Sequence, residues 1–197
     1  MRSFFLFISI LFSLSLNAQS DSLSNFVKPY DIKSGRIYYR FFNGIQQGEK
    51  TLVFDDYGLY EKMVSRTILT NGVNEDGQFT GDTLREMIIK KNQSIYKISL
   101  NDRTGAKTNR SETLPINLDA LRPGQVMIGP DTVSGKPCVI IESFAAVRTW
   151  YWNRIPIKKQ MIGRSAALKV EETAIKIDEN YVPSKNEFEV PDGIKIK

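Results

Sequence analysis

The chain of 197 residues carries 27 lysines and arginines against 22 aspartates and glutamates, and it has no histidine and one cysteine. Without histidine, triads that use it as a base are excluded, and a single cysteine makes a zinc centre very unfavourable. The net charge of +5 is spread with alternating sign along the chain, so we expect no nucleic-acid partner. We also expect no metal and no cofactor.

The N-terminus has the layout of a secretory signal peptide. A short basic start is followed by an apolar run over residues 4–16 and a polar stretch over residues 17–19. We predict a leader of residues 1–19, cleaved near Ala18 to Ser20, and a periplasmic protein of one β-rich domain over residues 20–197. The only cysteine, Cys138, is far from this junction, so no lipobox is present and a lipoprotein is not expected. No second apolar run is long enough to cross a membrane, so the mature chain has no predicted transmembrane segment.

Two short helices are predicted. Residues 21–29 place their apolar side chains at helical spacing and end at Pro29. Residues 117–121 lie between two prolines and form the second candidate.

Almost all of the remaining chain alternates polar and apolar residues with the period of a strand. In chain order, strands are predicted over residues 35–42, 50–54, 59–69, 84–90, 94–100, 138–144, 147–153, 157–162 and 167–177, with a last short one through Phe188 and Val190. Residues 71–82 read as a loop, residues 101–109 as a turn, and Asn153 and Arg154 as another turn. About nine to eleven short antiparallel strands with so little helix must curl to bury one face. The predicted fold is therefore mostly β, a single strongly curved antiparallel sheet with one or two short helices.

Both tryptophans stand two residues apart in one predicted strand. By alternation Arg148, Trp150 and Trp152 share one face of that strand. Two interpretations stay open at this point. The indole rings either fill the core of a curved sheet, or they line an apolar pocket.

Several segments, taken in order over residues 36–197, resemble a group of secreted Gram-negative proteins similar to the LolA/LolB-like periplasmic lipoprotein carriers. They are "GEKTLVFDDYG", "SIYKISLNDRTGAK", "GKPCVIIES", "WYWNRIPIKKQM" and "NEFEVPDGIKIK". The resemblance implies a half-barrel whose concave, apolar face carries an acyl chain and is capped by short helices. No single residue matches the arginine that gates the acyl chain in those carriers, so Arg40 and Arg148 are only candidates for a polar gate.

The leading hypothesis is a soluble, non-enzymatic carrier that holds a lipid, a lipoprotein acyl chain or another hydrophobic ligand on that face. Candidate lining residues are Tyr39, Phe41, Phe54, Tyr96, Ile98, Trp150 and Trp152. The alternative is a structural or protein-interaction module of the cell envelope whose barrel is filled and whose partners are envelope proteins.

Overall fold

The computed structural model describes residues 27–197 except residues 71, 76–78, 111–115, 144–146 and 162–169. The predicted leader and residues 21–26 of the first predicted helix lie outside this part of the chain, and the remaining residues 27–29 are not helical.

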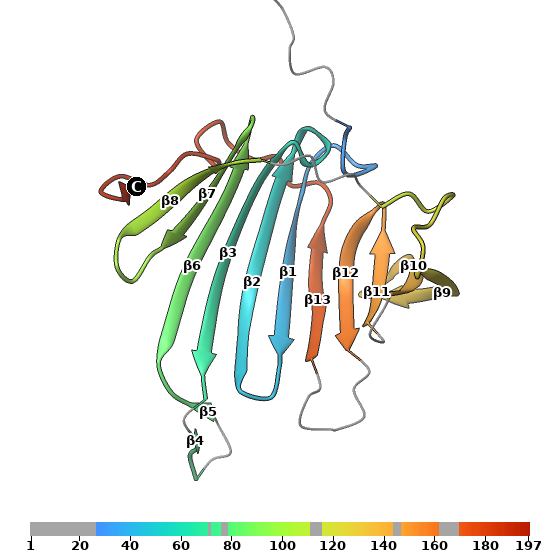
Figure 1. The fold of residues 1–197 in the computed structure, drawn as a ribbon, viewed down its shortest axis with the longest axis horizontal. Coiled ribbons are helices and arrows are strands. Elements are labelled where there is room, and N and C mark those ends of the chain that lie inside the picture. The colour runs from blue at the N-terminus through green and yellow to red at the C-terminus, as the bar shows by residue number, and fades with distance from the viewer. Residues whose placement is uncertain (1–26, 71, 76–78, 111–115, 144–146, 162–169) are drawn as a thin grey trace, which may run out of the picture.

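The described residues form one large sheet of twelve strands, in the order β14-β8-β7-β6-β3-β2-β1-β13-β12-β11-β10-β9 (Figure 1). Neighbouring strands are antiparallel except β14, which runs parallel to β8. The strands are β1 (Gly35–Phe42), β2 (Gln46–Asp55), β3 (Tyr60–Leu69), β6 (Thr83–Lys91), β7 (Ser94–Ser99), β8 (Thr104–Asn109), β9 (Val126–Val133), β10 (Lys136–Ser143), β11 (Val147–Trp152), β12 (Ile155–Met161), β13 (Val170–Asp178) and β14 (Lys195–Ile196). A separate ribbon of β4 (Gly72–Val73) and β5 (Phe79–Thr80) stands in the predicted loop. The prediction of a mostly antiparallel β protein is confirmed.

The second predicted helix is wrong. Residues 117–121 are irregular, and the side-chain carbonyl of Asn117 accepts hydrogen bonds from the backbone N–H groups of Asp119 and Ala120. This pattern is that of a helix N-cap, but no helical turn follows it. Within the described ranges the helical structure is limited to a 3-10 turn over Asp56–Gly58.

Three strand assignments are also wrong. No strand was predicted over the residues of β9. Residues predicted as a turn contain β8, an exposed strand with little apolar patterning that pairs with β7. Phe188 and Val190 do not lie in a strand, and the short final strand is β14 instead. The turn at Asn153 and Arg154 is confirmed, with φ of 47° and 62°, which is the geometry of a tight hairpin turn.

Cross-strand register assigns residues to the two faces of the sheet. Ile37, Leu52, Met63 and Ile88 lie directly opposite one another on β1, β2, β3 and β6 and define what we call the inner face. Residues that alternate with them lie on the outer face.

Two buried clusters form the core. The first contains residues of the inner face together with residues from β9 to β13. Its members are Tyr30, Ile37, Tyr39, Leu52, Phe54, Val133, Cys138, Trp150, Trp152, Ile155, Ile157 and Ala174. The second lies on the outer face of β2, β6 and β7, where the C-terminal segment after β13 covers it. Its buried members are Val53, Met87, Ile89, Ile98 and Phe188.

Contacts that skip strands explain how distant strands share the first cluster. The hydroxyl of Ser134, in the turn between β9 and β10, donates a hydrogen bond to the carbonyl of Ala174 on β13 at 2.5 Å. The phenol of Tyr39 on β1 donates to the carbonyl of Pro156 on β12 at 3.0 Å, across β13. Each contact joins segments that are not hydrogen-bonded neighbours in the sheet.

Candidate functional site

The predicted lining residues do not form one site. Tyr39, Phe54, Trp150 and Trp152 lie together in the first core cluster. The indole N–H of Trp150 is satisfied there, because it donates to a carboxylate oxygen of Asp131 at 2.7 Å. Both tryptophans are almost fully buried, with 5% and 6% of their surface exposed. These four side chains are packed core residues in the described structure.

The other three predicted lining residues lie elsewhere. Ile98 is buried in the second cluster and Tyr96 packs against it, both on the outer face. Phe41 lies at the far end of β1, beside a groove that also includes Arg40.

The two candidate gate residues are also separate. Arg40 approaches Glu49 at 3.9 Å on the outer face. Arg148 pairs with Glu142 at 2.7 Å on the neighbouring strand β10. The structure therefore does not bring these two arginines to one entrance.

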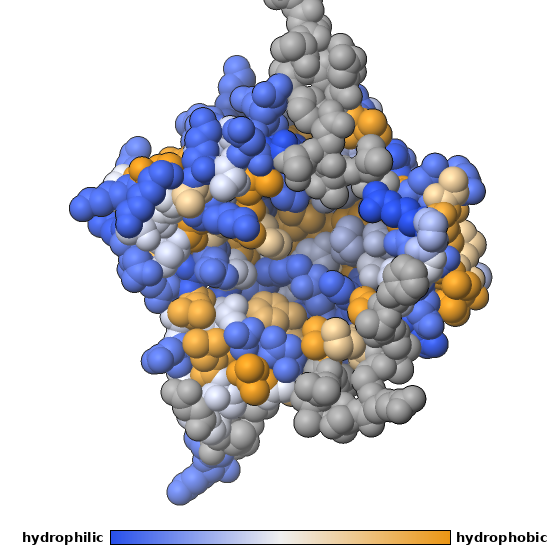
Figure 2. Space-filling model, viewed as in Figure 1, coloured by the Kyte–Doolittle hydropathy of each residue, from blue (hydrophilic) through white to orange (hydrophobic). Residues whose placement is uncertain are grey.

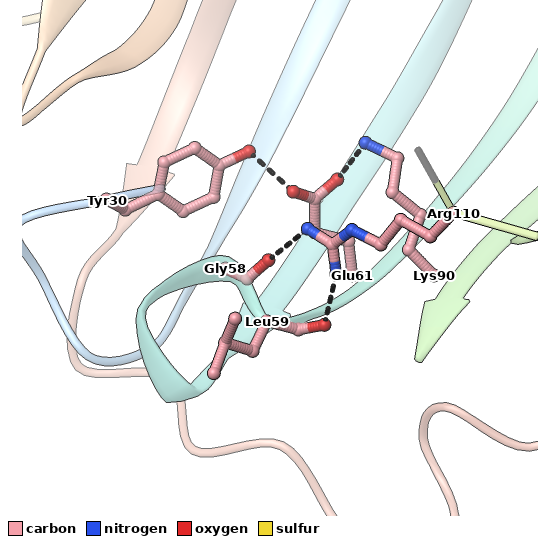
Figure 3. A network of polar contacts seen from close by, with 6 residues as sticks. All are labelled: Tyr30, Gly58, Leu59, Glu61, Lys90 and Arg110. Carbon is pink, nitrogen blue, oxygen red and sulfur yellow. Dashed lines mark hydrogen bonds and ion pairs between the residues drawn. The ribbon is translucent and has the colours of Figure 1, made fainter. Parts of the chain in front are cut away.

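A buried polar network on the inner face was not predicted from the sequence. Glu61 on β3 is 7% exposed, and its carboxylate accepts a hydrogen bond from the phenol of Tyr30 at 3.1 Å and pairs with Lys90 at 2.6 Å (Figure 3). Arg110 lies beside them and donates to the carbonyls of Gly58 and Leu59. Burial raises the pKa of Tyr30 well above its ordinary value, and the negative charge of Glu61 adds to this effect.

A second ion pair lies on the same face. Lys50 on β2 pairs with Glu172 on β13 at 2.6 Å, and its ammonium group lies 4.7 Å from the ring centre of Tyr39. Burial raises the pKa of Tyr39, and the charges of Glu172 and Glu61 raise it further. Charged groups thus stand beside apolar ones on this face.

The inner face changes from packed to open along one cross-strand row. Ile37 and Leu52 are buried, Met63 and Ile88 are half-buried, and Lys97 beyond them on β7 is exposed. An open groove of about 350 Å³ lies at this end, over β6, β7 and β8. Its lining residues are Glu86, Met87, Ile88, Lys97, Ile98, Ser99, Thr104, Gly105, Ala106 and Lys197. Figure 2 shows a hollow across the middle of the molecule in which hydrophobic and hydrophilic residues adjoin.

The part of the chain that the structure describes contains no group of three or more acidic or cysteine side chains arranged to hold a metal ion. Nor does that part include a helix with the length and apolar character needed to cross a bilayer.

No protein-family model and no curated protein matches this chain. Among solved structures, an uncharacterized conserved protein from Thermus thermophilus is similar with a TM-score of 0.52 and 5% sequence identity, over 84% of this chain and 90% of that one. MucB is similar with a TM-score of 0.47 and 9% identity, over 85% of this chain. The MucA/MucB complex of Pseudomonas aeruginosa is similar with a TM-score of 0.48 and 8% sequence identity, over 83% of this chain. The present chain spans 60% and 58% of those two MucB chains. At such identities the Thermus likeness shows a shared fold alone.

Proposed function

We propose that this chain is a non-enzymatic binding protein of the LolA/LolB-like type, exported to the periplasm, that holds an apolar ligand such as a lipid acyl chain on its inner face. In this proposal the sheet is a curved half-barrel. The contacts from β9–β10 and β12 back to β13 and β1 support that curvature. The leader predicted over residues 1–19 supports export.

The observation that carries the proposal is the row Leu52, Met63, Ile88 and Lys97. One face is filled with core side chains at the β1–β2 end and is open at the β6–β8 end. Half-buried aliphatic side chains beside a groove gain about 25 cal/mol for each Å² that a ligand removes from water. The proposed site is therefore displaced from the tryptophans toward Met63 and Ile88.

The test uses the whole protein and a neutral probe. Binding of N-phenyl-1-naphthylamine is followed by its fluorescence, and lipid retained after mild purification is identified by native mass spectrometry. Ile88→Asp places a charge in the groove, and we expect it to lower probe binding. Ile175→Asp, at an exposed position of β13, is the matched control and is expected to bind as the unaltered protein does. If the unaltered protein neither retains lipid nor binds the probe, the proposal that it holds an apolar ligand is contradicted.

The alternative is a filled module that binds another envelope protein. The burial of Trp150 and Trp152 favours it, and so does the edge strand β9, which exposes Val126, Met127 and Ile128. An exposed apolar edge strand can pair with an extended segment of another protein. The discriminating substitution is Met127→Lys, which places a charge between the exposed side chains of Val126 and Ile128. If β9 is the working surface, this variant is expected to lose its protein partner in a pull-down from the cell envelope while probe fluorescence stays unchanged.

A further inference from the structure

A row of charged side chains crosses the outer face of the sheet. Arg40, Glu49, Arg66 and Arg85 lie directly opposite one another on β1, β2, β3 and β6. They alternate along their strands with inner-face residues such as Tyr39, so they point away from the first core cluster. The row is distinct from the groove proposed above.

The charges in this row are not balanced. Arg40 and Glu49 are both exposed and approach only to 3.9 Å. Among the residues that the structure describes, the guanidinium groups of Arg66 and Arg85 form no ion pair or hydrogen bond. Like charges directly opposite on neighbouring strands destabilise a sheet. Keeping these two arginines side by side therefore has some cost in stability.

A groove of about 400 Å³ lies over this row at the ends of β1, β2 and β3. Its lining combines the charged residues with apolar ones. The lining residues are Arg40, Phe41, Phe42, Gln47, Gly48, Glu49, Arg66 and Ile68. Phe42, Gln47 and Ile68 are cross-strand neighbours on the same face, so two apolar side chains, on either side of Gln47, adjoin the arginines.

We propose that this groove binds an anionic group of the phosphate type that is carried on a short apolar stem. Guanidinium groups match such oxyanions with paired N–H donors, and charge-assisted hydrogen bonds of this kind are strong. Phe42 and Ile68 provide the contact for the stem. The site centres on Arg40 and Arg66, because both line this groove, whereas Arg85 lines a second groove that contains Asp82, Glu86 and Asp102.

This groove lies on the outer face, opposite the proposed apolar site, and it recognises a charged group. It therefore goes beyond the proposed function. The full chain is titrated calorimetrically with dihexanoyl phosphatidate, with dihexanoyl phosphatidylcholine and with inorganic phosphate, all at one ionic strength. We expect the phosphatidate to bind most tightly. Arg40→Gln and Arg66→Gln are each expected to weaken it about tenfold, the loss that accompanies one charge-assisted hydrogen bond.

Two control variants test whether the affinity for phosphatidate comes from this groove. One tests the effect of overall charge and the other tests the inner face. Lys185→Gln removes one exposed cation outside the groove and is expected to leave the affinity unchanged. Ile88→Asp is expected to retain phosphatidate binding even where it loses the neutral probe. Equal binding of phosphatidylcholine, an equal loss in Lys185→Gln, or loss of phosphatidate binding in Ile88→Asp would each overturn the site. Inorganic phosphate binding as tightly as phosphatidate would overturn the role of the apolar stem.

Discussion

The phenol of Tyr30 donates a hydrogen bond to the buried carboxylate of Glu61 at 3.1 Å, across 31 positions of the sequence. Lys90 pairs with the same carboxylate from the next strand. Glu61→Gln removes the charge that both partners face, so we expect the free energy of unfolding to fall by about 1–3 kcal/mol. Urea unfolding measures the change. Glu189→Gln removes an exposed carboxylate that pairs with Lys91 and is the matched control, with an expected loss below about 1 kcal/mol.

Tyr30 and Tyr39 predict how stability changes in alkali. Both have pKa values raised by burial in the folded state. Their contribution to stability is complete below the ordinary tyrosine pKa of about 10 and is lost as the pH rises above it, because the unfolded chain then releases protons that the folded chain retains. Tyr30→Phe is expected to flatten this decline, and the double substitution with Tyr39→Phe to flatten it further. Unfolding free energies between about pH 8 and about pH 11 test this; an unchanged slope in the double variant would contradict it.

The burial of the tryptophans predicts that they act as core residues. Trp150→Ala and Trp152→Ala each leave a cavity in the first cluster, and we expect each to cost about 3–5 kcal/mol. Ile175→Ala, at an exposed position, is expected to change stability by less than about 0.5 kcal/mol. A small loss at both tryptophans, with their fluorescence quenched by added acrylamide, would instead indicate that they line an open pocket.

The opposed arginines of the outer face predict a stabilising substitution. Arg85→Glu places a carboxylate opposite Arg66, and we expect a gain of about 0.2–1 kcal/mol at low salt. The gain should shrink as salt screens the pair. Arg103→Glu, at an exposed turn residue, serves as the control for the general effect of net charge. A gain that is the same at both positions would show that the pairing itself contributes nothing.

Alternation predicted the strands wherever one face of a strand is buried. Segments such as "GRIYYRFF" and "SIYKISL" place apolar residues two apart, and they form β1 and β7. β8 has no such pattern because it is largely exposed, and it could not be found in this way. The helix predicted over residues 117–121 is absent: the asparagine side chain caps two backbone N–H groups there, as at the start of a helix, but the turn does not continue.

The candidate site was harder to predict than the fold. Pairing shifts by one residue between Tyr38 and Tyr39 and between Trp150 and Tyr151. A bulge changes which face the following residues occupy relative to the neighbouring strand. Parity within one strand therefore could not be carried across the sheet. The predicted lining residues were divided between two clusters and, for Phe41, a separate groove. The network around Glu61 depends on pairing between distant segments, which no local pattern reports.

The order of the strands has a consequence for how the chain folds. β1 to β8 pair mainly with neighbours in sequence, as do β9 to β13, but β1 completes its pairing only with β13, where Tyr39 meets Ala174. Contacts between residues so far apart in sequence form slowly. As the chain folds, two hairpin arrays can therefore assemble early, and the unpaired side of β1 stays open until β13 joins it. Factors that shield this strand from aggregation would act in that interval.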